Sequence, residues 1–220
     1  MNRPDRDTLY RLFEECLHAP YRQVENGGSY AIKRRNSHVT VFFEDSDGAL
    51  DWRNNFRFFA RPYRRMKEVW RCHRGFLSVF RAVLPYLLPI ITDESVKEFT
   101  VVGYSHGAAL ALLCHEYIWY HRPDRRDALM TVAFGCPRVI YGNPPFLKER
   151  FEGFFPVKNI DDLVTHLPPA LFGYRHVKAP ITIGKRGRYS SVDAHRPEAY
   201  RHELLFGGVL PERREVLYDG

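Results

Sequence analysis

Cysteine is scarce in this sequence, with four residues among 220. The four are scattered along the chain, and no two form a Cys-x-x-Cys pair: Cys16, Cys72, Cys114 and Cys136. This spacing excludes a small scaffold held together by disulfides. It is typical of reduced, mostly buried thiols and therefore favours a cytoplasmic protein.

Long apolar runs are lacking too. The longest, around residues 83–91, is broken by Pro85 and Pro89 and is too short to span a bilayer. Residues 1–20 contain no apolar signal-peptide core and no small-residue cleavage site, so we expect no secretory signal and a cytoplasmic location. Internal repeats, low-complexity tracts and linkers are absent as well. We therefore expect a single domain over residues 1–220.

What the sequence does contain is enough apolar material for a core. Hydrophobic residues make up 45% of the chain, which excludes a disordered protein. The formal net charge is +7, which favours attraction to anionic surfaces. Nucleic acid and lipid head groups both fit that charge, so charge alone does not choose a partner.

Segments typical of strands alternate with segments typical of helices. The start of the chain, residues 1–20, predicts a helix with Leu9, Leu12, Phe13 and Leu17 on one face. Residues 29–35 and 38–44 predict two strands joined by a polar turn. The further predicted segments are helices over 74–88 and 106–121 and strands over 98–104, 130–137, 154–160 and 180–185. This alternation predicts an α/β fold with a mostly parallel central sheet flanked by helices, followed by a surface tail over 207–220.

The stretch VVGYSHGAALALL, residues 101–113, places a serine where the strand pattern changes to a helix pattern. A nucleophile elbow needs small residues on both sides of its serine, because Cβ atoms there would collide with the strand and helix. Gly103 and Gly107 occupy these places around Ser105. The turn would also direct the backbone N–H of His106 towards the space above the serine, where a helix N-terminus favours an oxyanion. A tight turn without chemistry is the competing interpretation.

A nucleophilic serine needs a base and an acid, which follow it in the chain order Ser, Asp/Glu, His in α/β-hydrolases. Asp161 and Asp162 follow a predicted strand end, where such folds place site residues. The candidate bases after them are His166, His176, His195 and His202. Spacing alone does not choose among these histidines.

The order of several motifs over residues 38–205 resembles the class 3, or fungal-type, lipases of the α/β-hydrolase superfamily. The matching stretches are VTVFFEDSDGALDWRNNF, CHRGF, VVGYSHGAALA, AFGCPRV, NIDDLVTHLPP, FGYRHV and DAHRPEAY. The resemblance implies an α/β-hydrolase fold without a large cap domain. It also implies ester hydrolysis through an acyl-enzyme, with no cofactor and no metal.

Carried over position by position, the resemblance implies Ser105 as nucleophile, Asp162 as acid and His195 as base. It assigns the oxyanion hole to Ser46 and to the backbone N–H of His106. His176 corresponds to a family histidine that is not catalytic.

The sequence departs from the family pattern at three places. Phe43-Glu44-Asp45-Ser46 replaces Phe-Arg-Gly-Ser/Thr, so the oxyanion turn lacks its glycine. Tyr104 and His106 replace the usual His and Leu around the serine. Thr165 replaces a family proline.

The segment 52–71 interleaves cationic and aromatic side chains: Arg53, Arg57, Arg61, Arg64, Arg65, Lys67 and Arg71 with Trp52, Phe56, Phe58, Phe59, Tyr63 and Trp70. Three interpretations stay open. The segment is a solvated basic face with core aromatics, a flap that contacts an anionic membrane surface, or a single-stranded nucleic-acid binder. The last is the weakest, because no nucleic-acid-binding motif accompanies it. A lipase or esterase, a catalytically silent hydrolase fold that binds lipid or a partner, and a nucleic-acid binder are thus the three candidate functions.

Overall fold

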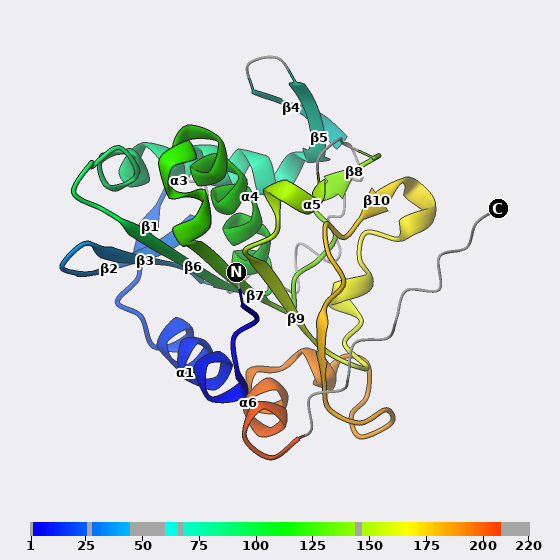
Figure 1. Ribbon diagram of the computed structural model, residues 1–220. Coiled ribbons are helices and arrows are strands. Elements are labelled where there is room, and N and C mark those ends of the chain that lie inside the picture. Colours follow the sequence, from blue (N-terminus) through cyan, green and yellow to red (C-terminus); the bar gives the residue numbers. More distant parts are fainter. Residues whose placement is uncertain (1, 26–27, 45–59, 66–67, 144–146, 208–220) are drawn as a thin grey trace.

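The computed structural model describes residues 2–25, 28–44, 60–65, 68–143 and 147–207, and its centre is a seven-stranded sheet (Figure 1). The strand order is β1-β2-β3-β6-β7-β9-β11. The five strands from β3 to β11 run parallel, and β1 and β2 pair antiparallel at one edge. The strands are β1 (Arg22–Val24), β2 (Gly28–Arg35), β3 (His38–Phe43), β6 (Glu98–Tyr104), β7 (Leu129–Phe134), β9 (Phe154–Asn159) and β11 (Ile181–Ile183).

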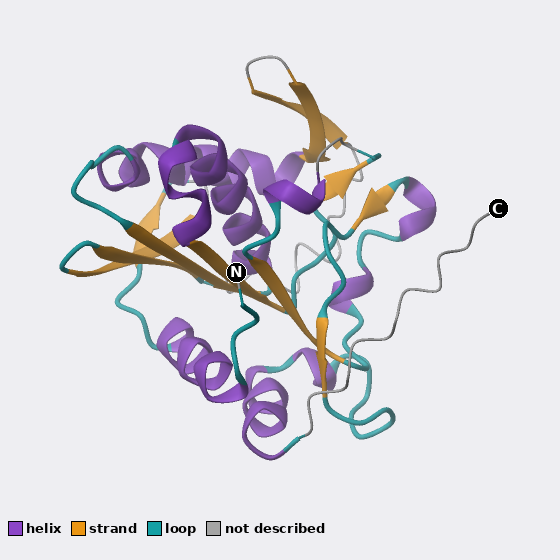
Figure 2. Ribbon diagram, in the orientation of Figure 1, coloured by secondary structure: helices purple, strands orange, loops and turns teal. Residues whose placement is uncertain are grey.

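Helices cover both faces of this sheet (Figure 2). On one face, α3 (Arg74–Ile91) and α4 (His106–His121) share a core with the inward residues of β3 and β6. On the other face lie α1 (Arg6–Leu17) and α6 (Pro197–Phe206). Because alternate residues of a strand face opposite sides, Val101 joins the first core and Val102 the second. A strand that is covered on both faces has apolar residues at nearly every position. The apolar run at residues 98–104 therefore predicts β6 from the sequence alone.

A second, four-stranded antiparallel sheet was not expected from the sequence. Its order is β10-β8-β5-β4, and β4 and β5 form a hairpin that extends from the body of the molecule (Figure 1). Its strands are β4 (Ala60–Arg65), β5 (Glu68–His73), β8 (Ile140–Tyr141) and β10 (Tyr174–Arg175). Two-residue strands carry no alternation that a sequence pattern can reveal. Of the basic aromatic segment, residues 52–59 and 66–67 lie outside the described residues, and Trp70 is buried.

The remaining helical elements are short: α5 (Leu147–Arg150) and the 3-10 turns η1 (Pro123–Ala128), η2 (Val164–His166), η3 (Ala170–Phe172) and η4 (Asp193–His195). The predicted surface tail lies outside the described residues from position 208 onward.

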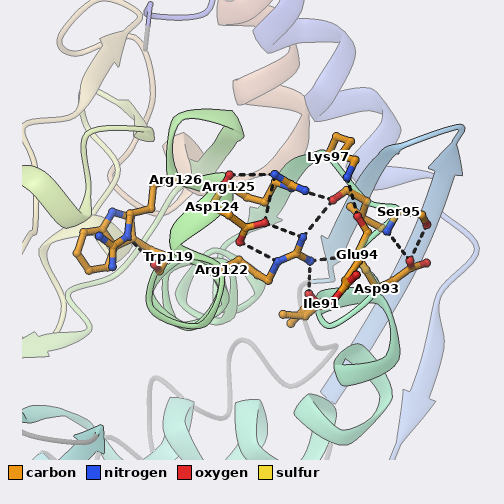
Figure 3. Close-up of polar contacts among 11 residues, drawn as sticks. Ile91, Asp93, Glu94, Ser95, Lys97, Trp119, Arg122, Asp124, Arg125 and Arg126 are labelled. Atoms are coloured by element: carbon orange, nitrogen blue, oxygen red, sulfur yellow. Dashed lines mark hydrogen bonds and ion pairs between the residues drawn. The ribbon is translucent and has the colours of Figure 1, made fainter.

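Helix α3 continues three residues beyond its predicted end, although it contains Pro85 and Pro89. Arg122, at the C-terminal end of α4, supports the end of α3 (Figure 3). Its guanidinium donates to the carbonyls of Ile91, at 2.6 Å, and Asp93, at 3.1 Å. The bond to Ile91 satisfies one of the acceptors that a helix C-terminus leaves without an intrahelical donor.

By length and composition alone, α3 is also apolar enough to cross a membrane. Its apolar face is buried in the core shared with α4, through Phe76, Phe80, Val83 and Leu87. It therefore serves this fold as a core helix.

Candidate active site

Ser105 lies at the junction of β6 and α4, as the nucleophile-elbow pattern predicts. Its backbone has φ 55° and ψ −118°, a conformation that L-residues rarely adopt. A Cβ atom on Gly103 would lie 2.2 Å from the carbonyl oxygen of Gly107, and one on Gly107 would lie 2.2 Å from that of Phe43. Both contacts are with backbone atoms that cannot move aside, so the elbow requires glycine at both places.

The Ser105 hydroxyl belongs to a continuous chain of hydrogen bonds. His195 Nε2 lies 2.7 Å from Ser105 Oγ, and His195 Nδ1 lies 2.8 Å from Asp162 Oδ2. Ser105 and Asp162 are fully buried, and the side chain of His195 is 14% exposed. With the Nδ1–H donating to Asp162, Nε2 has a lone pair available to accept the proton of the serine hydroxyl.

The carboxylate of Asp162 is held by two further donors. The backbone N–H of Val164 donates to Oδ1 at 2.8 Å, and the Tyr200 hydroxyl donates to Oδ2 at 2.6 Å. Burial, followed by the nearby charge of Asp162, raises the pKa of Tyr200 well above its usual value, so this phenol stays protonated and remains a donor. Tyr200 was not among the predicted site residues. The one signal for it is its place at the end of DAHRPEAY.

The other candidate acid and bases have partners of their own. Asp161 Oδ2 accepts from the N–H of Gly187 at 2.6 Å. His166 Nε2 lies 2.7 Å from Lys158 Nζ, and His176 Nε2 lies 2.7 Å from the carbonyl oxygen of Thr165. His202 Nδ1 lies 3.4 Å from Glu203 Oε1. The structure thus places His195, and not these three histidines, next to Ser105.

His106 is the first residue of α4, so its backbone N–H is among the helix N–H groups that have no intrahelical acceptor. Its imidazole is buried beside Phe76, with ring centroids 5.5 Å apart. Burial, and then the charge of His73, lowers the pKa of His106 to about 4, so the ring is neutral near pH 7. Ser46, the other predicted oxyanion residue, lies outside the described residues.

Two further histidines, His115 and His121, lie on α4. His115 is buried, and its two ring nitrogens lie 2.8 Å from Thr131 Oγ1 and from the carbonyl oxygen of Arg150. His121 is exposed at the end of α4. In the part of the chain that the structure describes, no three His, Cys, Asp or Glu side chains gather as metal ligands would.

An α/β sheet with a Ser–His–Asp chain of hydrogen bonds at a strand-to-helix elbow defines the α/β-hydrolase fold of serine hydrolases. Within that class, the model of the family Lipase (class 3) matches residues 40–172, which is more than half of the chain. The protein belongs to the class 3 lipase family.

Named relatives agree with this assignment. A lipase of Rhizomucor miehei is 28% identical over 155 residues, covering 66% of this chain and 42% of the relative. A secreted mono- and diacylglycerol lipase of Malassezia globosa is 35% identical over 129 residues, covering 54% of this chain and 40% of the relative. The chain thus spans less than half the length of these curated relatives.

Solved structures support the same fold. The propeptide complex of Rhizomucor miehei lipase superimposes with a TM-score of 0.64 and 23% identity, covering 80% of this chain and 62% of the other. Lipase II of Rhizopus niveus gives a TM-score of 0.60 and 24% identity, covering 71% of this chain and 61% of the other.

The predicted cytoplasmic location is wrong. Relatives from Fusarium solani and from two Malassezia species are named as secreted lipases. The prediction depended partly on scattered cysteines, and all four are indeed buried. A buried thiol is inert in any compartment, however, so buried cysteines do not identify one.

Proposed function

We propose that this protein hydrolyses carboxylic esters, in particular acyl esters of lipids, with Ser105 as nucleophile, His195 as base and Asp162 as acid. The observation that carries the proposal is the pair of hydrogen bonds at 2.7 and 2.8 Å that joins these three residues at the elbow. The names of the relatives support the lipid ester as substrate, because they describe lipases and mono- and diacylglycerol lipases.

In the first half of the reaction, Ser105 Oγ attacks the acyl carbonyl while His195 Nε2 takes the hydroxyl proton. Asp162 fixes the imidazole tautomer and stabilises the imidazolium that forms. The backbone N–H of His106 binds the developing oxyanion, a role for which Ser46 is the proposed second donor. Each such donor contributes about 2.7–4 kcal/mol to lowering the barrier.

This tetrahedral intermediate collapses, His195 gives its proton to the leaving alcohol, and the acyl group stays on Ser105. In the second half, a water molecule attacks the acyl carbonyl while His195 takes its proton, and His195 returns that proton to Ser105 Oγ as the carboxylic acid leaves. Three donors, on His195, Val164 and Tyr200, hold the carboxylate of Asp162 in position beside the imidazole.

A fluorophosphonate probe tests the nucleophile directly. The probe should form one covalent adduct per chain, which mass spectrometry of the digested protein should locate at Ser105. Heat-unfolded protein is the control and should not react, because the activation of Ser105 depends on His195. A folded protein that does not react would favour the alternative, a catalytically silent hydrolase fold that binds lipid or a partner.

We also propose that the segment 52–71 contacts anionic membrane surfaces. The support is its composition, since cationic and aromatic residues alternate along it. Replacing Arg61, Arg64 and Arg65 by Gln should lower binding to vesicles of anionic lipid by roughly a hundredfold, because each cation near such a surface contributes about 1 kcal/mol. Turnover of a soluble short-chain ester should not change. Vesicle co-sedimentation at low and high salt measures the binding, and added salt should weaken it.

A charge-matched control separates this segment from the overall charge of the protein. It replaces three exposed arginines on α1, β1 and β2 by Gln: Arg11, Arg22 and Arg35. Equal losses of vesicle binding in both triple variants would refute a specific role for 52–71. No loss in either would leave the segment as a solvated basic face.

A further inference from the structure

His195 lies on a short segment whose own hydrogen bonds are local. Its 3-10 turn η4 is three residues long, and its N–H bonds are short-range: Ala194 to Ser190 at 2.9 Å and His195 to Val192 at 3.1 Å. The imidazole must nevertheless stay within hydrogen-bonding distance of both Ser105 and Asp162. A displacement of 1 Å at such a place can cost about a hundredfold in rate. Contacts from the rigid sheet must therefore fix this segment.

Two side chains from strand ends of the sheet reach successive carbonyls of η4. Asn159, at the end of β9, donates from Nδ2 to the carbonyl of Ala194 at 3.1 Å. Tyr104, at the end of β6, donates its hydroxyl to the carbonyl of His195. Tyr104 is also the residue directly before the nucleophile, so a single side chain joins the elbow to the backbone of the base.

The ring of Tyr104 supports the imidazole as well. The two rings are stacked, with centroids 5.4 Å apart and planes inclined by 21°. Tyr104 is in turn held edge-on by Phe13, at 5.5 Å, and by Tyr200, at 5.8 Å. Its 3% exposure leaves it no alternative position in solvent. Aromatic pairs favour defined stacked or edge-on orientations, so these contacts restrict the plane of the Tyr104 ring.

We propose that Tyr104 is a positioning residue for the base: its hydroxyl fixes the backbone of His195, and its ring fixes the plane of the imidazole over Ser105. The pattern of the family has a histidine at this place. The shorter histidine side chain lacks the phenol that makes the contact here, so this arrangement is a feature of this chain. Tyr104 does not take part in proton transfer, because its hydroxyl is directed at a main-chain carbonyl.

This inference rests on the proposed function, and steady-state kinetics of Tyr104→Phe and Tyr104→Leu on a soluble short-chain ester test it. Tyr104→Phe keeps the ring stack and loses one hydrogen bond, so kcat should fall about fivefold. Tyr104→Leu loses both contacts, and kcat should fall by roughly tenfold to a hundredfold. KM should stay the same in both variants, because a buried residue behind His195 does not touch the substrate.

The matched control is Tyr21→Phe. Tyr21 likewise donates its hydroxyl to a main-chain carbonyl, that of Cys16 at 2.6 Å, and it is not part of the site. Both Phe variants should lower the melting temperature to a similar extent, whereas only Tyr104→Phe should lower kcat. Unchanged kcat in folded Tyr104→Phe and Tyr104→Leu, an equal loss of kcat in Tyr21→Phe, or a change confined to KM would each overturn the inference. If Ser105→Ala retained full turnover, the proposed function itself would fail, which is a distinguishable result.

Discussion

Ser105→Ala should lower the turnover of a soluble acyl ester by roughly 10⁴-fold to 10⁶-fold, the loss that removal of an activated serine causes in enzymes with this arrangement. The variant lacks the oxygen that attacks the carbonyl, and His195 then has no hydroxyl to deprotonate. The fold should persist, because Ala fits the space of Ser and the two elbow glycines are unchanged. Stopped assays with purified protein, together with its melting temperature, measure both effects.

Ser78→Ala is the matched control for this experiment. Ser78 is exposed on α3, so the same loss of one hydroxyl there should leave turnover unchanged. Retained turnover in a folded Ser105→Ala protein would show that Ser105 is not the nucleophile, whatever the geometry around it.

The acid and the base should be almost as sensitive as the nucleophile. Asp162→Asn should cost about 10⁴-fold in kcat, because an amide in place of the carboxylate favours the wrong imidazole tautomer. His195→Ala should cost a similar factor or more, because it removes the group that accepts the serine proton. Both effects should appear in kcat on a soluble ester, and melting temperatures should exclude loss of the fold.

The matched controls make the same chemical changes at the neighbouring candidates. In Asp161→Asn, the amide oxygen can still accept from the N–H of Gly187, so kcat should change little. His176→Ala removes a bond to the carbonyl of Thr165 and should lower stability more than turnover. Burial lowers the pKa of His176 to about 4, so a neutral ring is lost near pH 7 and no charge is removed from the site. An outcome in which Asp161→Asn or His176→Ala is the crippled variant would refute our assignment.

Four histidines that are buried or partly buried have lowered pKa values. For His73, His106, His115 and His176, burial lowers the pKa to about 4. A histidine with a lowered folded-state pKa adds full stability above its unfolded value of about 6.5, and this stability is lost as the pH falls towards 4. Protonation of these rings should therefore lower the stability of the fold as the pH falls from about 6.5 towards 4.

Local patterns in the sequence were sufficient for the elbow and for most of the sheet. The apolar run 98–104, the glycines at 103 and 107 and the small residues after them predict a strand, a sharp turn and a helix by local sterics alone. The same holds for the hairpin of β2 and β3, whose turn includes Asn36 with φ 54°. The sequence did not predict the second sheet, because its strands β8 and β10 contain two residues each. They pair with each other, and β8 pairs with β5, across long separations in the sequence.

The identity of the base shows where local information ends. By itself, the sequence determined a serine at an elbow, two successive aspartates after a strand and four histidines further along, and only a family resemblance selected His195. The tertiary structure brings His195 across 90 positions of sequence to Ser105, and it adds Tyr104 and Tyr200 as contacts of the base and the acid. Such pairings depend on how the strand ends and the loops after them meet in space. The sterics of neighbouring residues, which fix an elbow, carry no information about that.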